Sequence, residues 1–87
     1  MPKMEKEITI MNPQGLHARP AAVFVQIAAK FGSRITVQKD GERVNGKSIM
    51  GILMLAAQCK SKVILEVDGQ DAEKAMTELE GFLTSEK

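Results

Sequence analysis

The apolar residues of this 87-residue chain change their spacing along the sequence, and this alternation constrains the fold more than any other feature. Residues 4–11, 34–38, 43–45 and 62–68 alternate apolar and polar side chains, which is typical of half-buried β-strands. Residues 18–30, a short segment from Ile49 and the segment after Asp71 carry apolar side chains at helical spacing. The predicted element order is therefore β-α-β-β-α-β-α.

Turn and capping residues separate these elements. Asp40 and Gly41 predict a hairpin, because both tolerate the positive φ of a tight turn. Ser48 and Asp71 stand where helices are predicted to begin and are good N-cap residues. Gly32 follows the first helix and is predicted to be its C-terminal cap.

The same spacing predicts which side chains are buried. The expected core side chains of the first and last strands are Ile8, Ile10, Val63, Leu65 and Val67. Those of the long helices are Phe24, Ile27, Ala28, Phe31, Ala72, Ala75, Met76, Leu79, Phe82 and Leu83. Polar alternates in the strands (Glu7, Thr9, Arg34, Thr36, Glu66) predict that one sheet face is solvated. We therefore expect one α+β domain over residues 1–87, an open-faced two-layer sandwich with a four-stranded antiparallel sheet and three helices on one face.

Composition excludes several classes of protein. An apolar fraction of 44% suits a folded domain, and a net charge of +1 argues against a dedicated nucleic-acid binder or a polybasic membrane binder. The single cysteine, Cys59, allows no internal disulfide and is expected to be a small core or semi-exposed residue rather than a reactive thiol. No apolar run approaches the ~18 residues of a membrane span, and the first residues are charged, so we expect a cytoplasmic protein without membrane insertion.

The chemistry of the chain is concentrated in residues 15–21, Gly-Leu-His-Ala-Arg-Pro-Ala. His17 is the only histidine, and the helical pattern that follows places it at a helix N-terminus, where Pro20 suits the first turn. The free N–H groups of Ala18 and Arg19 and the helix dipole favour an anion there. A neutral imidazole is also a nucleophile, so His17 is predicted to accept a phosphoryl group, with Arg19 compensating its charge.

Residues 15–21, followed by residues 45–51 (Asn-Gly-Lys-Ser-Ile-Met-Gly), resemble the HPr family of histidine-containing phosphocarriers of the bacterial phosphoenolpyruvate-dependent phosphotransferase system. The resemblance extends over nearly the whole chain and keeps the order of elements. It implies that Enzyme I phosphorylates His17 on Nδ1 and that Enzyme II A domains receive the phosphoryl group for sugar uptake. It implies a carrier rather than an enzyme, with no cofactor and no metal. We expect a monomer, because the domain is small and charge-balanced.

The resemblance also assigns roles to the segment that follows residue 47. It implies that an HPr kinase/phosphorylase phosphorylates Ser48 and that regulators read the product, whereas the structural alternative is an ordinary N-cap serine. It implies that Ile49, Met50 and Leu53 form an exposed patch for partners while Ile52 and Leu55 are buried. Ala56 falls on the same side of the helix as these two, and the alternative is that all of these residues are buried.

Other functions remain as alternatives. The chain could be a regulatory or nitrogen-branch member of the same family, although a purely regulatory variant would lack His17. A β-α-β-β-α-β core also occurs in nucleic-acid-binding and ligand-binding modules. RNA readers of that kind stack bases on sheet aromatics, whereas Phe24, Phe31 and Phe82 all fall on helix stripes, and no basic stripe exists. A phosphate-loop enzyme is disfavoured because Gly41, five residues before Gly46, belongs to the hairpin.

Overall fold

The computed structural model describes residues 3–86, so residues 1, 2 and 87 of the predicted domain lie outside the described part. The elements are β1 (Lys3–Thr9), α1 (Ala18–Ala29), β2 (Arg34–Lys39), β3 (Glu42–Asn45), α2 (Ile49–Leu55), β4 (Lys62–Asp68) and α3 (Ala72–Thr84). This is the predicted order, β-α-β-β-α-β-α. The Asp40 and Gly41 turn has positive φ at both residues, as predicted for the hairpin between β2 and β3.

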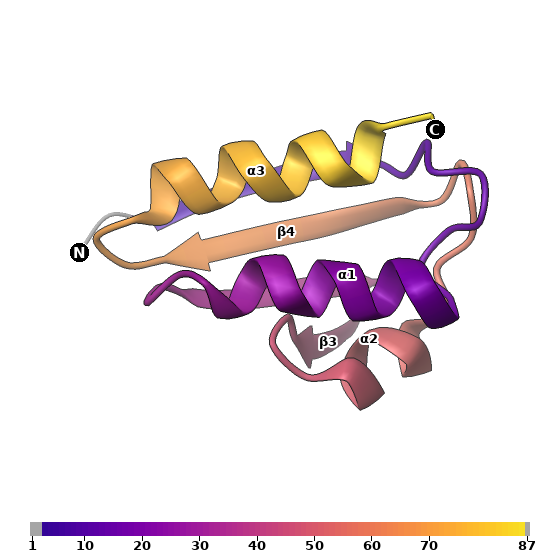
Figure 1. The fold of residues 1–87 in the computed structure, drawn as a ribbon, viewed down its shortest axis with the longest axis horizontal. Helices are drawn as coiled ribbons and strands as arrows, with labels where there is room; N and C mark the ends of the chain where they lie inside the picture. The colour runs from indigo at the N-terminus through magenta and orange to yellow at the C-terminus, as the bar shows by residue number, and fades with distance from the viewer. Residues whose placement is uncertain (1–2, 87) are drawn as a thin grey trace.

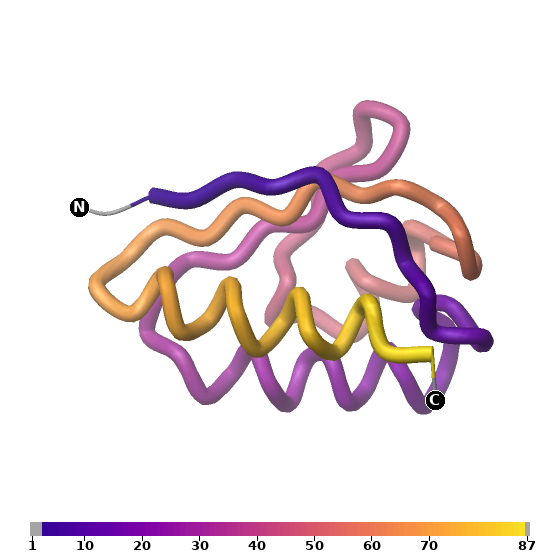
Figure 2. The backbone as a smooth tube through the Cα atoms, turned by 90° about the horizontal axis from the view of Figure 1, so that it is seen from above, coloured from indigo at the N-terminus to yellow at the C-terminus, as the bar shows by residue number. Residues whose placement is uncertain are grey.

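The four strands form one antiparallel sheet in the order β1-β4-β2-β3. The three helices lie on one side of it, with α1 between α3 and α2 (Figure 1). Figure 2 shows the strands side by side and the two long helices together beneath them. The predicted open-faced sandwich is confirmed.

The core fills the space between the helices and one face of the sheet. Its fully buried larger side chains are Ile10, Leu16, Phe24, Ile35, Val37, Ile52, Val63, Leu65, Val67, Met76, Leu79 and Leu83. The strand side chains that were predicted to be core are all buried: Ile8, Ile10, Val63, Leu65 and Val67. Ile27, Phe31 and Phe82 are only partly buried and pack against the margin of this core. The helical spacing therefore predicted too many fully buried positions on the long helices.

The first strand is shorter than the alternation predicted. It ends at Thr9, although Ile10 is still fully buried. Beyond Thr9 the backbone is hydrogen-bonded to the turn before β4 and not to a strand. Ile10 N donates to Ser61 O at 2.8 Å, and Lys60 N donates to Ile10 O at 2.6 Å. Lys60 has φ +74°, a turn conformation that ends the regular ladder.

The end of α1 also differs from the prediction. The C-cap is Lys30 in a right-handed conformation, and Gly32 does not adopt a positive φ, so the prediction of a glycine cap was wrong. Side chains from other elements hold this end instead. Lys47 Nζ donates to Phe31 O at 2.6 Å, and an Asp71 carboxylate oxygen accepts from Gly32 N at 2.9 Å. These contacts supply partners that a glycine cap would have provided locally.

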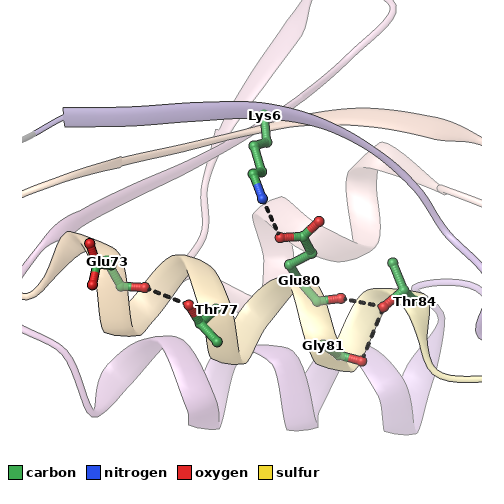
Figure 3. Close-up of polar contacts among 6 residues, drawn as sticks. All are labelled: Lys6, Glu73, Thr77, Glu80, Gly81 and Thr84. Carbon is green, nitrogen blue, oxygen red and sulfur yellow. Dashed lines mark hydrogen bonds and ion pairs between the residues drawn. The ribbon is translucent and has the colours of Figure 1, made fainter.

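Ion pairs connect both edge strands to the rest of the fold. On the open sheet face, Glu66 of β4 binds Lys3 of β1 at 2.7 Å and Arg43 of β3 at 2.6 Å. On the helix side, Lys6 binds Glu80 of α3 at 2.8 Å (Figure 3). The hydrogen bond and charge of Lys3 lower the pKa of Glu66, and the same contact raises the pKa of Lys3. The two edge strands are therefore held through one central carboxylate.

Asp71 links the start of α3 to the segment after α1. It occupies the predicted N-cap position, but its side chain does not cap α3. Its carboxylate accepts instead from Gly32 N, from Ser33 N at 3.0 Å and from Ser33 Oγ. The Ser33 hydroxyl, followed by the Gly32 amide, lowers the pKa of the Asp71 carboxyl. The predicted start of the helix is therefore confirmed. The predicted capping role is wrong, because the carboxylate binds the segment after α1 and not the first amides of α3.

We expect Asp71→Asn to lower the melting temperature at neutral pH, because an amide cannot accept all three hydrogen bonds. The folded-state pKa of Asp71 is depressed, so its contribution is present above the ordinary value of 3.8 and is lost as pH falls through the folded value. The difference between wild type and variant should therefore shrink in thermal melts taken from neutral to strongly acidic pH. Glu73→Gln, an exposed carboxylate on the same helix, is the control. A difference that does not change with pH would contradict the assignment.

Candidate functional site

The loop before α1 is built around the side chain of Asn12, which is 8% exposed. Its Oδ1 accepts from Gln14 N at 3.0 Å, and its carbonyl accepts from Gly15 N at 2.9 Å. Asparagine favours this kind of local turn because its side chain can replace a backbone acceptor. The sequence analysis read residues 12–15 only as a loop and did not identify Asn12 as the residue that shapes it.

Gly15 is the point where this loop passes closest to the rest of the fold. It has φ +64°, and a Cβ there would lie 2.5 Å from Ala57 O and 2.9 Å from the Gln58 Cα. The next residue, Leu16, is fully buried and donates its N–H to Ala57 O at 2.8 Å. The backbone before His17 is thus fixed against the segment that joins α2 to β4.

His17 is the N-cap residue of α1, as predicted. It is in an extended conformation with φ −100° and ψ 169°, and its carbonyl accepts from Ala21 N at 3.0 Å. The side chain is exposed and makes no capping hydrogen bond. Within residues 3–86 the imidazole has no ion-pair or hydrogen-bond partner, so both ring nitrogens are available to an external group.

The first turn of α1 provides the setting for an anion next to this imidazole. Ala18 and Arg19 are exposed, and their amides have no acceptor in the described part of the chain. Pro20, which has no N–H, is buried, and the first turn contains no acidic residue. Arg19 forms no ion pair with any residue described. The helix dipole, two free amides and a guanidinium therefore all favour negative charge at this position.

Ser48 begins helix α2, which is partly exposed and packs against α1. Ser48 is the N-cap of α2, and its Oγ accepts from Gly51 N at 3.1 Å, so its predicted capping role is confirmed. Figure 1 shows α2 beside the N-terminal half of α1, and the two helices pack together. A group added to the Ser48 oxygen would therefore lie at the start of α2.

Large apolar side chains are exposed on α2. The exposed fractions are 40% for Ile49, 64% for Met50, 37% for Leu53 and 66% for Met54. Ile52 and Leu55 are buried, so the alternative in which all these side chains are core is wrong. Ala56, which was grouped with the inward side, is exposed because it ends the helix with φ +50°. Met54 was not predicted, although its position one turn after Met50 could have indicated it.

The side chains of the described residues form no cluster that could hold a metal ion. No cluster of three or more metal-ligating residues occurs between residues 3 and 86, and no helix there is long and apolar enough to cross a membrane. Cys59 is half-buried, with its Sγ 3.8 Å from Met11 O. The three phenylalanines belong to helices or to the segment just after α1, and none stands on the open sheet face.

Comparison with known proteins gives consistent results. Residues 4–85 match the family described as "PTS HPr component phosphorylation site". The phosphocarrier protein HPr of Neisseria meningitidis is 47% identical over 76 residues, which cover 87% of this chain and 85% of that protein. The crystal structure of HPr from Bacillus anthracis superposes with a TM-score of 0.91 at 42% identity, covering 93% of this chain and 96% of that one. Crh of Bacillus subtilis, whose crystal structure is a dimer with a swapped domain, has a TM-score of 0.78 at 39% identity and 94% coverage of both chains.

We expect Gly15→Ala to destabilise the protein by about 2–4 kcal/mol, because it combines left-handed strain with a backbone clash. Gly41→Ala is a matched control, since Gly41 also has positive φ but a Cβ there meets nothing within 4 Å. The control should lower the free energy of unfolding only by the cost of holding alanine in a left-handed conformation, about 1–2 kcal/mol. Urea unfolding of both variants measures the difference. Equal losses would mean that the close approach to Ala57 and Gln58 does not constrain the loop.

Proposed function

Because the chain belongs to the HPr family, we propose that it carries a phosphoryl group on His17 between two kinds of protein. Phosphorylated Enzyme I, charged from phosphoenolpyruvate, is the proposed donor, and Enzyme II A domains are the proposed acceptors. The observation that carries this proposal is the exposed, unpartnered imidazole at a helix N-terminus with a free guanidinium two residues away. In this scheme the protein is a substrate and product of other enzymes and not itself an enzyme.

Besides the His17 nucleophile, the transfer step needs positioning and charge compensation more than further covalent assistance. The lone pair of His17 Nδ1 attacks phosphorus, the P–N bond forms, and the bond from phosphorus to the donor's leaving atom breaks. Nε2 keeps its proton, so the ring becomes cationic beside the transferred phosphoryl oxygens. The reverse order of events delivers the group to the acceptor. No carboxylate in the first turn of α1 opposes the incoming negative charge.

Arg19 and the two free amides are proposed to compensate that charge. The N–H groups of Ala18 and Arg19 are aligned with the dipole of α1 and would donate hydrogen bonds to phosphoryl oxygens without reorganisation. The Arg19 guanidinium adds a charge-assisted hydrogen bond. Pro20 supports the first turn with its fixed φ and contributes no amide that would remain unsatisfied.

Ser48 is proposed to be a regulatory phosphorylation site for an HPr kinase/phosphorylase. Its N-cap position would place a phosphate at the positive end of α2, where little refolding is needed. The added negative charge would lie beside Ile49 and Met50, which are proposed, with Leu53, to form the docking patch for Enzyme I and Enzyme II A domains. Regulation would then act through charge at the partner-binding face.

A regulatory role without phosphoryl transfer is the second candidate. It is favoured by the similarity to Crh, whose crystal structure is a domain-swapped dimer. His17 and its open helix end favour the carrier instead, and we propose that the carrier is a monomer. Light scattering at concentrations from micromolar to millimolar tests the oligomeric state, and a stable dimer would contradict the proposed monomer.

Incubation with Enzyme I and phosphoenolpyruvate should add one phosphate to the wild-type protein, measured by intact mass. The phosphate should be acid-labile, because it is bound to nitrogen, and should be absent from His17→Ala. Arg19→Ala should still accept phosphate, at a rate lower by about 10- to 100-fold, because one charge-assisted contact is lost. No mass gain with active Enzyme I would contradict the carrier function.

Met50→Asp should raise the KM for phosphorylated Enzyme I by about tenfold while leaving the melting temperature within a few degrees. Met50 is mostly exposed, so the fold does not depend on its burial. Ser48→Asp should act in the same direction through charge. Met54→Asp tests whether the patch extends one turn further. If Met50→Asp and Ser48→Asp leave KM unchanged, or if Met50→Asp unfolds the protein, α2 is not the docking surface.

A further inference from the structure

A polar pocket of about 770 Å³ opens at the edge of the sheet, beyond the C-terminal end of α1. Strand β3 pairs only with residues 36–39 of β2, so the first residues of β2 run past the end of β3. The pocket occupies this notch, between residues 32–36 and residues 43–47. The length of α1, about 18 Å for 12 residues, separates it from His17. Its volume is within the range of small-molecule sites, about 300–1,000 Å³.

Positive charge predominates around this notch. Four cationic side chains and two carboxylates line the pocket and a smaller one that adjoins it: Lys3, Arg34, Arg43, Lys47, Glu66 and Asp68. Glu66 is already bound by two of the cations, Lys3 and Arg43. Arg34, by contrast, has no ion pair among residues 3–86, although Asp68 is directly opposite it on β4. The notch can therefore accept an anion without displacing an existing ion pair of Arg34.

The strand register brings two guanidinium groups to one hydroxyl. Arg34 and Thr36 are two residues apart on β2, so their side chains lie on the same, open face of the sheet. Arg43 reaches this row from β3, because it binds Glu66, the residue opposite Thr36 on β4. Within residues 3–86 the Thr36 hydroxyl has no hydrogen-bond partner. An anion over Thr36 would thus meet one free hydroxyl between two arginines.

Two residues at the end of β3 add further donors. Asn45 is opposite Thr36, and its Oδ1 accepts from Lys47 N at 2.8 Å. The amide oxygen is thereby engaged in the turn, and the amide nitrogen remains a donor. Lys47 Nζ donates to Phe31 O at 2.6 Å, which holds the ammonium group at the pocket with two N–H bonds to spare. The surroundings of Thr36 therefore suit a group that accepts many hydrogen bonds.

We propose that this pocket binds a phosphorylated sugar or polyol, with the phosphate between Arg34 and Arg43 over Thr36 and a hydroxyl group on Asp68. Phosphate suits converging guanidinium, hydroxyl and amide donors. The Asp68 carboxylate would repel a second phosphate but accepts from a hydroxyl group. None of the residues that line the pocket is aromatic, which disfavours a nucleotide. This site needs neither His17 nor Ser48 and is separate from the proposed carrier function.

The test titrates the ¹⁵N-labelled protein with glucose 6-phosphate at fixed ionic strength and follows the amide chemical shifts. We expect saturable shifts at residues 32–36, 43–47 and 68, with a Kd on the order of 1 mM. Arg34→Gln, which breaks no ion pair, should raise the Kd about tenfold, and Thr36→Val about threefold. Lys62→Gln is the matched control, because Lys62 is exposed on β4 outside the pocket, and it should leave the Kd unchanged.

Inorganic phosphate and glucose test the two halves of the ligand. Inorganic phosphate should shift the same amides with a Kd about tenfold higher, and glucose at the same concentrations should shift none. Asp68→Asn should weaken glucose 6-phosphate about threefold without weakening inorganic phosphate, since it removes only the acceptor for a hydroxyl group. A well-dispersed spectrum shows that each variant is folded.

Four results would overturn the proposal. The first is the absence of saturable shifts around the notch, and the second is equal affinity for inorganic phosphate and glucose 6-phosphate. The third is a loss in Lys62→Gln as large as that in Arg34→Gln, which would indicate unspecific charge attraction. The fourth is tighter binding of ADP than of glucose 6-phosphate. His17→Ala should bind glucose 6-phosphate as wild type does, so failure of the carrier function and failure of this site are distinguishable.

Discussion

Burial of one face of β4 is the interaction on which the rest of the structure depends. This strand is hydrogen-bonded to β1 on one side and to β2 on the other, and its inward side chains Val63, Leu65 and Val67 are all buried beneath the helices. The alternation fixes the register, because a shift of one residue would expose all three. Its outward side chain Glu66 ties both edge strands to the centre through Lys3 and Arg43. One strand therefore organises the core on one face and the sheet edges on the other.

The candidate site lies at the end of this framework, where two irregular segments meet. The close contact of Gly15 with Ala57 and the hydrogen bond from Leu16 to the same carbonyl set the backbone position at which α1 begins. Leu16 is fully buried while His17, the next residue, is exposed. The change from core to solvent within one residue gives the imidazole a rigid base and leaves the ring accessible. Such a base matters because phosphoryl transfer depends on positioning.

The sequence predicted the elements well because their apolar spacing is regular, and it predicted His17, Arg19 and Ser48 in their observed positions because helix starts carry local signals. It failed where the partner of a group comes from a distant segment. Gly32 looked like a cap, but the end of α1 is held by Lys47 and Asp71, which lie 15 and 39 residues further along the chain. The role of Asn12 was missed for a different reason, because its hydrogen bonds with Gln14 N and Gly15 N are local but follow from no periodicity. The exposure of Met54 could have been predicted, because it lies one helical turn after the exposed Met50.

The lack of local partners for His17 is itself consistent with a carrier. A histidine that acts as a general base is commonly held by a carboxylate, which orients the ring and stabilises its charged form. A carboxylate so close would repel a phosphoryl group and would compete with it for Arg19. The first turn of α1, which follows the imidazole directly, carries instead two amides without an acceptor and the Arg19 guanidinium, and all three favour an anion. In the proposed carrier these groups would stabilise the phosphoryl group without forming bonds to phosphorus, so the group would remain transferable.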